Sequence, residues 1–140
     1  GECPDPQAEE TFKRSTLDFS RLEENRHKVL FSFYQRLIAL RKQHPEFVSR
    51  RRMKIGCRKS QNLIWWMRNF GAVQWLCVMN YDTNVRPFPI VYEGWQKIID
   101  SSDSLWLGPG GGPPGRVTKP DKISIQPRSV ILYESVKHQP

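Results

Sequence analysis

The sequence has few cysteines, and their positions suit neither a disulfide framework nor a zinc site. The three cysteines lie far apart, with no CxxC pair, at Cys3, Cys57 and Cys77. This pattern favours free thiols in a reducing compartment, so we expect a cytoplasmic protein. The histidines stand at no ligand-like spacing from the cysteines, and we expect no metal site. No apolar run approaches the roughly 20 residues that cross a bilayer, and no signal peptide is visible, so we expect no membrane partner.

The chain also lacks a convincing set of catalytic residues. Half of its 14 acidic residues lie in the first 24 positions, namely Glu2, Asp5, Glu9, Glu10, Asp18, Glu23 and Glu24. Acids at a helix start have a structural explanation in the helix dipole. The glycine-rich run "GPGGGPPG", residues 108–115, lacks the GK[ST] ending of a phosphate loop, and its prolines remove backbone donors. We therefore predict a loop there, no cofactor and no catalytic residue in the chain itself.

Basic residues outnumber acidic ones by 22 to 14, which gives a net charge of +8. The densest basic stretch is "SRRRMK", from Ser49 to Lys54. It could bind phosphates of a nucleic acid. The alternative is a solvated loop or a charged edge strand, and charge on an edge strand discourages aggregation. We favour the second interpretation, because the other cations are scattered, and we expect no nucleic-acid partner.

A long helix is predicted near the N-terminus. Ser20 and Glu23 have the spacing of a capping box, and the helix should run from there to about Gln43, before Pro45. Its main apolar stripe comprises Leu30, Phe33, Tyr34, Leu37, Ile38 and Leu40. Val29 and Phe31 lie outside that stripe, so the helix needs cover on more than one side. That cover could come from a larger protein or from the N-terminal segment folding over the helix, and both alternatives stay open.

The rest of the chain has the texture of a β domain. Short apolar runs separated by Gly, Pro and Asn extend from residue 53 to residue 135. We predict an α+β, mostly β fold, in which one long N-terminal helix packs on an antiparallel β-sandwich. Pro87 and Pro89 interrupt their strand, which should therefore lie on an edge or be irregular.

Two adjacent tryptophans, Trp65 and Trp66, raise the possibility of a sugar-binding platform. Because successive side chains of a strand point to opposite faces, one of them should enter the core and the other should face outward or toward another domain. A carbohydrate-binding module using Trp65, Trp66, Trp95 or Trp106 is the main alternative function, and the basic segment 50–54 offers a weaker one, nucleic-acid binding.

Five stretches of sequence together resemble one enzyme family. They read "PDPQAEETFKRSTLDF", "FSFYQRLIALRKQHPEF", "VMNY", "GWQKIIDSSDSLWLGPGG" and "ISIQPRSVILYES". Over nearly the whole chain, from Pro4 to about Ser135, this resembles the C-terminal region of malto-oligosyltrehalose trehalohydrolases, glycoside hydrolases of the α-amylase superfamily. The first stretch is specific, whereas the β part alone resembles amylase domain C in general.

The resemblance implies a parent enzyme that releases trehalose by cutting the adjacent α-1,4 bond of maltooligosyl trehalose. The Asp nucleophile, the Glu acid/base and the supporting Asp of that family belong to an upstream (β/α)8 barrel, which would be the partner of this chain. Residues 1–44 would be the N-terminal segment and the last barrel helix, and residues 45–140 the sandwich called domain C. Asp5 and Gln7 would follow the last barrel strand, where they could touch an α-glucan substrate.

Overall fold

The computed structural model describes residues 4–49, 53–90, 94–118 and 121–136. Helices come first: α1 (Glu9–Ser15), the 3-10 turn η1 (Phe19–Glu23), α2 (Asn25–Gln43) and the turn η2 (Pro45–Phe47). The strands follow as β1 (Lys54–Arg58), β2 (Leu63–Phe70), β3 (Val73–Asn80), β4 (Arg86–Ile90), β5 (Trp95–Asp100), β6 (Arg116–Val117), β7 (Asp121–Ile125) and β8 (Ser129–Val136). Two further 3-10 turns lie between strands, η3 (Lys59–Gln61) and η4 (Ser104–Trp106).

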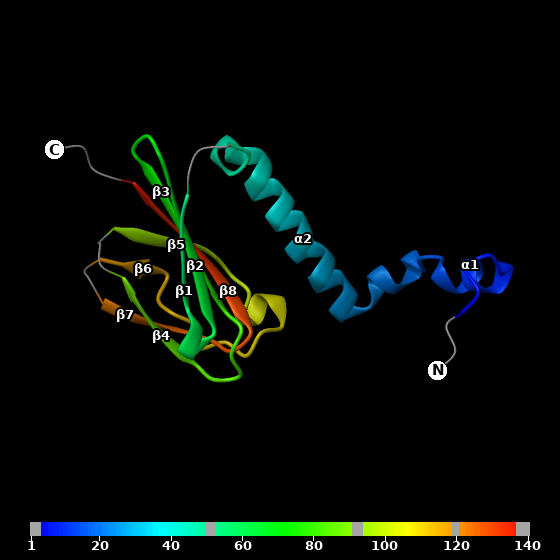
Figure 1. Ribbon diagram of the computed structural model, residues 1–140. Coiled ribbons are helices and arrows are strands. Elements are labelled where there is room, and N and C mark those ends of the chain that lie inside the picture. Colours follow the sequence, from blue (N-terminus) through cyan, green and yellow to red (C-terminus); the bar gives the residue numbers. More distant parts are fainter. Residues whose placement is uncertain (1–3, 50–52, 91–93, 119–120, 137–140) are drawn as a thin grey trace.

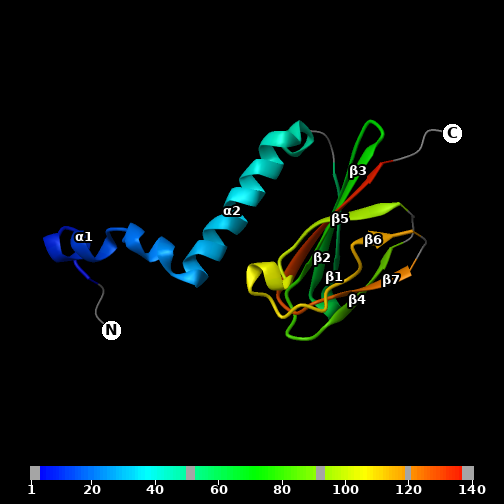
Figure 2. The same cartoon turned by 180° about the vertical axis from the view of Figure 1, so that it is seen from behind.

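The strands form two antiparallel sheets. A six-stranded sheet has the order β1-β2-β3-β8-β5-β6, and β4 pairs with β7 in a two-stranded sheet. The smaller sheet covers one face of the larger sheet, while α2 lies across the opposite face (Figure 1, Figure 2). The predicted fold class, a helix packed on an antiparallel sandwich, is confirmed. Pro87 and Pro89 lie in β4, an edge strand, as predicted.

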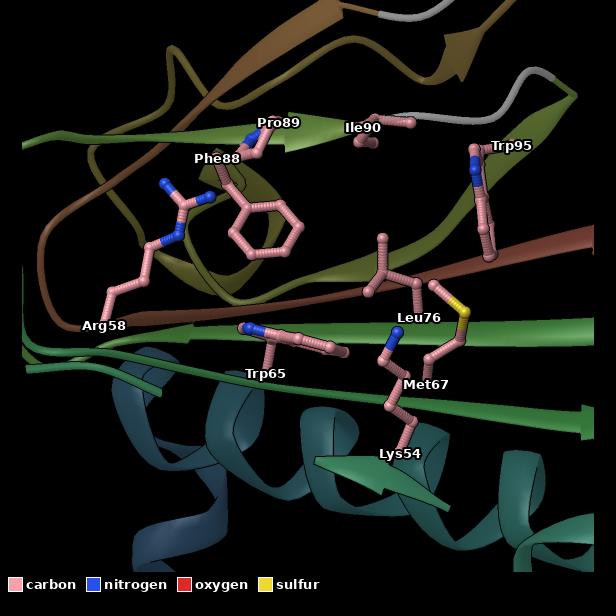
Figure 3. A pocket seen from close by; sticks show the side chains of 9 residues that line it. All are labelled: Lys54, Arg58, Trp65, Met67, Leu76, Phe88, Pro89, Ile90 and Trp95. Carbon is pink, nitrogen blue, oxygen red and sulfur yellow. The ribbon is translucent and has the colours of Figure 1, made fainter. Parts of the chain in front are cut away.

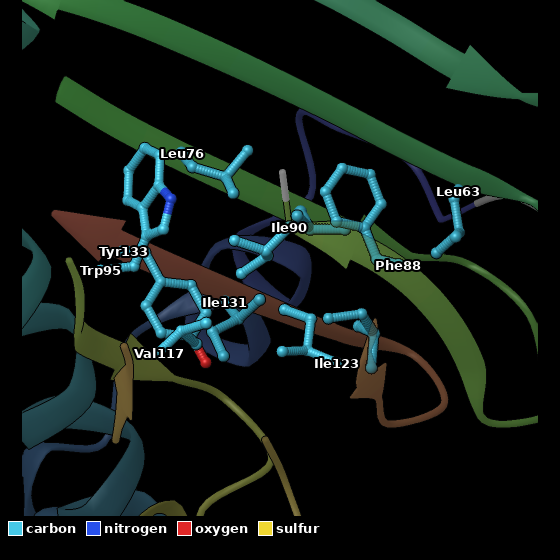
Figure 4. Packing of buried hydrophobic residues seen from close by; sticks show 11 residues of the cluster. Leu63, Leu76, Phe88, Ile90, Trp95, Val117, Ile123, Ile131 and Tyr133 are labelled. Carbon is cyan, nitrogen blue, oxygen red and sulfur yellow. The ribbon is translucent and has the colours of Figure 1, made fainter. Parts of the chain in front are cut away.

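Two apolar clusters stabilise these layers. The larger one lies between the sheets (Figure 4) and comprises Leu63, Leu76, Val78, Phe88, Ile90, Trp95, Val117, Ile123, Ile125, Ile131 and Tyr133. The second lies between the six-stranded sheet and α2, and its buried members are Leu40, Trp75, Cys77, Ile99 and Leu132. Burial in this cluster raises the pKa of the Cys77 thiol to about 12, which leaves it an unreactive apolar side chain at neutral pH.

The long helix starts later than the sequence predicts. Ser20 is not an N-cap, because its backbone N–H and its hydroxyl both donate to the Asp18 carboxylate, at 3.0 and 2.6 Å. Asp18 therefore caps the separate turn η1. Glu24 is extended, with φ −68° and ψ 130°, and this conformation ends η1 before α2 begins at Asn25. The capping-box prediction is wrong because Asp18 accepts the backbone N–H of Ser20. In a capping box that N–H would donate to the Glu23 side chain.

A buried asparagine ties the two sheets together at the end of β3. The Asn80 side-chain amide donates to the carbonyls of Asn84, Ile125 and Gln126 at 2.9, 3.1 and 3.0 Å. Its side-chain oxygen accepts the N–H of Asp82 at 2.9 Å. Asn80 is only 2% exposed, so these bonds form in a setting where a lost partner costs more than it does in water.

The glycine-rich loop serves packing. It wraps around a polar cluster in which Asp100 accepts both the N–H and the hydroxyl of Ser102, at 2.9 and 2.6 Å. The Tyr133 hydroxyl donates to the Pro114 carbonyl at 2.8 Å. A Cβ added at Gly112 would collide with the Asp100 carboxylate, so a glycine is needed there for close approach.

Replacing Gly112 by alanine should therefore destabilise the fold by about 1–3 kcal/mol, because a fully buried carboxylate would have to move. Gly115→Ala is the matched control, since a Cβ there meets no atom within 4 Å. We expect its free energy of unfolding to stay the same or rise slightly. Urea denaturation of both variants measures the difference, and equal stabilities would contradict the packing role of Gly112.

Asp82 should make stability depend on pH. Hydrogen bonds from Arg86, at 2.7 and 3.1 Å, and from the Asn84 backbone hold the pKa of Asp82 well below its usual value. A lowered folded-state pKa contributes stability that is complete above the unfolded value near 3.9 and is lost as the pH falls through the folded value. Asp82→Asn should therefore lower Tm at neutral pH. The difference in Tm between this variant and the unsubstituted chain should become smaller below about pH 4. Arg86→Gln should show the same pH dependence of the Tm difference. A Tm difference that is constant from pH 7 to pH 2 would contradict the role of the Asp82 carboxylate.

Candidate functional site

The end of α2 is anchored to the sheet by a buried carboxylate that the sequence pattern did not reveal. Oε1 of Glu46, in η2, accepts the Trp75 indole N–H at 3.0 Å and lies 3.2 Å from Nδ1 of His44. Arg68 donates to the Glu46 backbone carbonyl at 2.7 Å. Burial opposes ionisation of Glu46, but the bonds from its own backbone N–H, Trp75 and His44 outweigh it and hold the pKa of Glu46 below its usual value. The direction in which α2 leaves the sheet is thus fixed at one point.

From this anchor, one side of α2 packs on the six-stranded sheet. Leu40 is 4% exposed, and Phe33 lies edge-on to Trp106 with ring centroids 5.1 Å apart. Phe47 continues the contact in η2, with its ring 4.5 Å from that of Trp75. Of the six residues in the predicted apolar stripe, only Phe33 and Leu40 face the sheet.

The rest of the stripe faces away from the sheet and is solvent-exposed. Phe31 (48% exposed) lies beside these side chains, and together they form a surface that we call the outer face of α2. Its other members are Leu30 (53%), Tyr34 (58%), Leu37 (38%) and Ile38 (53%). At 3.6 residues per turn these five side chains fall on one contiguous side of the helix. The prediction that α2 carries apolar surface on more than one side is confirmed. A contiguous patch of large apolar side chains marks an interaction site.

The N-terminal segment does not cover this outer face. It extends away from the sheet beyond the start of α2 (Figure 1), and its own large apolar side chains are exposed: Phe12 (73%), Leu17 (76%) and Phe19 (72%). Of the two alternatives for covering α2, folding of this segment over the helix therefore does not occur. The outer face of α2 and the exposed apolar side chains of the N-terminal segment are therefore left uncovered by the described residues.

The two predicted substrate-binding residues of that segment lie together. Asp5 accepts the backbone N–H of Gln7 at 2.9 Å in an exposed turn before α1. This turn is at the opposite end of the helical segment from the sheet (Figure 2). The structure therefore separates Asp5 and Gln7 from both tryptophans of the predicted platform.

Trp65 and Trp66 point to opposite faces of β2, as the alternation of strand side chains predicts. Trp65 packs against the cluster between the sheets, 6.2 Å from the ring of Phe88, and Trp66 packs toward α2, 6.4 Å from Phe47. Neither belongs to the exposed large side chains, and the same holds for Trp75, Trp95 and Trp106. A flat sugar platform needs an exposed ring, so this geometry favours packing roles for all five tryptophans.

The basic segment of the sequence is only partly described by the structure. Arg50, Arg51 and Arg52 lie outside the described residues, and of the basic segment only Ser49, Met53 and Lys54 are placed. Within the described ranges, no group of three His, Cys, Asp or Glu side chains could hold a metal ion. Among the helices that the structure describes, none is long and apolar enough to cross a membrane.

Comparison with known proteins gives partial matches. No protein-family model matches the chain. It is 49% identical over 43 residues to a malto-oligosyltrehalose trehalohydrolase from Brevibacterium helvolum, a match covering 31% of this chain and 7% of that protein. It is 28% identical over 85 residues to one from Deinococcus radiodurans, covering 61% and 14%. The chain is thus partially homologous to this family, as the resemblance implies, and spans a small fraction of its relatives' length.

Solved structures match in fold. The trehalulose synthase MutB from Pseudomonas mesoacidophila MX-45, an α-amylase family enzyme, aligns with a TM-score of 0.55 at 19% identity. The alignment covers 74% of this chain and 17% of MutB. An inactive double mutant of MutB gives a TM-score of 0.57 at 18% identity. At this identity the likeness concerns the fold, and it agrees with the chain forming one part of a multidomain protein.

The two sides of α2 should respond differently to truncation. Leu40→Ala removes a buried side chain and should lower the free energy of unfolding by about 2–5 kcal/mol. Tyr34→Ala, on the same helix but on the outer face, should change it by less than about 0.5 kcal/mol. Thermal or urea unfolding of the 140-residue chain compares them. If Tyr34→Ala were as destabilising as Leu40→Ala, the outer face would have to be covered within this chain.

Proposed function

We propose that this chain is the C-terminal, non-catalytic part of a trehalose-forming glycoside hydrolase, and that the outer face of α2 packs against the catalytic barrel of that enzyme. The parent would hydrolyse the α-1,4 bond next to trehalose in maltooligosyl trehalose. The single observation that carries the proposal is the uncovered apolar surface of α1, η1 and α2. Partial homology to trehalohydrolases supports the choice of parent.

The energetics support a permanent intramolecular partner for α2. Burying one Leu, Ile or Phe side chain stabilises a fold by about 1.5–3 kcal/mol, and the outer face offers five large apolar side chains. Because Glu46 fixes the direction of α2, the sheet would hold this face toward a barrel at a defined angle. Residues 1–44 would then belong physically to the barrel, and residues 45–140 would form domain C.

Further roles follow from the same proposal. Asp5 and Gln7 would lie where the chain leaves the last barrel strand, at the face where barrel enzymes bind substrate. The α-glucan would be bound and cut by the parent's barrel, with the sandwich supporting its last helix. Exposed Cys57 and buried Cys77 are free thiols, which agrees with a cytoplasmic location.

The first test is activity of the isolated chain. We expect no trehalose from maltooligosyl trehalose incubated with the purified 140-residue chain, because it would lack the barrel carboxylates. Chromatography of the products measures this, with the Deinococcus radiodurans trehalohydrolase as the positive control. Trehalose release above background would overturn the non-catalytic role.

The second test concerns the parent protein. We expect the coding sequence upstream of Gly1 to encode a (β/α)8 barrel with two Asp and one Glu at strand ends, and the absence of such a barrel would overturn the proposal.

In that full-length protein, Tyr34→Gln/Ile38→Gln should lower Tm by several degrees. Ser32→Gln/Arg36→Gln, exposed at the same spacing on another side of α2, should leave it nearly unchanged. Equal effects of the two pairs would argue against docking through the outer face.

A further inference from the structure

A cavity of about 240 Å³ lies between the two sheets, where the sandwich opens between β1 and β4. Its walls are largely apolar and include Trp65, Met67, Leu76, Phe88 and Ile90 (Figure 3). An apolar cavity of about 150 Å³ is enough for benzene, so this one has room for a molecule of up to two fused rings. It lies on the sheet face away from α2 and takes no part in the docking surface.

The cavity depends on the position of Trp65. Gly56 pairs with Trp65 across β1 and β2, and a Cβ at Gly56 would come within 2.7 Å of three atoms of the Trp65 indole. The indole therefore lies over the backbone of β1, where any larger residue at position 56 would push it away. In this position the Trp65 ring forms a wall of the cavity (Figure 3).

The nitrogen-bearing side chains among the described lining residues are all hydrogen-bond donors. Lys54 Nζ lies 5.9 Å from the centroid of the Trp65 ring, and the Arg58 guanidinium lies 5.6 Å from that of Phe88. Within the described part of the chain, neither cation has a carboxylate partner. Trp95, at the other end of the cavity from Arg58 (Figure 3), is 1% exposed, and its indole N–H has no acceptor among the described residues.

Among the described lining residues, four side chains carry hydrogen-bond donors, and two of these, Lys54 and Arg58, are charged. Trp65 and Trp95 are the other two, and the thioether sulfur of Met67 is only a weak acceptor. A sugar hydroxyl both donates and accepts, so this lining suits sugars poorly. It matches a ligand that only accepts hydrogen bonds and carries negative charge.

We propose that this cavity binds a small apolar carboxylate, with its ring system between Trp65, Phe88 and Leu76 and its carboxylate at the mouth beside Lys54 and Arg58. The site is independent of the proposed function, because it faces away from α2 and contains none of the outer-face residues. A neutral ligand of the same shape would lose the charge interaction with both cations.

The test uses naphthoate, with its uncharged amide naphthamide as the matched ligand. We expect naphthoate to bind the 140-residue chain about tenfold more tightly, equivalent to about 1.4 kcal/mol. Isotope-edited NMR should show the largest shifts at the Trp95 indole N–H and the Met67 methyl group, which separates this site from adsorption on α2. Equal affinities, or shifts confined to Leu30, Tyr34 and Ile38, would overturn the proposal, as would a response of Trp95 to maltoheptaose but not to naphthoate.

Variants of the cations provide a second arm. Lys54→Gln/Arg58→Gln should weaken naphthoate at least about fivefold while leaving naphthamide binding unchanged, because only the charge interaction is lost. Lys59→Gln/Arg116→Gln removes two cations that lie outside the cavity and should leave both affinities unchanged. Equal loss of naphthoate binding in the two double variants would show a general effect of net charge and would overturn the site.

Discussion

The central strand β3 is buried on both faces, and the rest of the structure depends on covering it. Its residues from Gln74 to Val78 are all buried, with Leu76 and Val78 facing the small sheet and Trp75 and Cys77 facing α2. An antiparallel sheet commonly leaves one face to solvent, and this one cannot do so. The strands β4 and β7 therefore supply one cover, and α2 supplies the other.

Because α2 covers one face of the sheet, only part of its apolar surface is buried there, and the rest forms the exposed outer face. A helix that only covered the sheet would carry polar residues on its far side. The anchor at Glu46 and Trp75 turns Phe33 and Leu40 inward and leaves Tyr34 and Ile38 outward. The same helix thus packs on the sandwich with one side, and its other side is available to the second body that the proposed function requires.

Local patterns predicted the elements of this fold better than the contacts between them. Apolar periodicity predicted the helix and its surplus surface, and alternation predicted the opposite directions of Trp65 and Trp66. The start of α2 was missed because Asp18 competes for Ser20. The anchor and the cavity were missed because they join residues distant in sequence: Glu46 meets Trp75, and cations of β1 meet the aromatic rings of β2 and β4. No spacing rule relates such positions, since strand pairing decides which of them meet.

The position of β8 has a consequence for how the chain is made. Strands β1, β2 and β3 follow one another as neighbours, but β8, Ser129–Val136, lies between β3 and β5. During translation, the other strands of both sheets therefore emerge from the ribosome before β8, the strand that joins β3 to β5. Until β8 is made, β3 and β5 each present an unpaired strand edge, and such an edge favours aggregation. The six-stranded sheet can close only once Ser129–Val136 has been made, and a stop codon before Ser129 would leave that sheet in two halves.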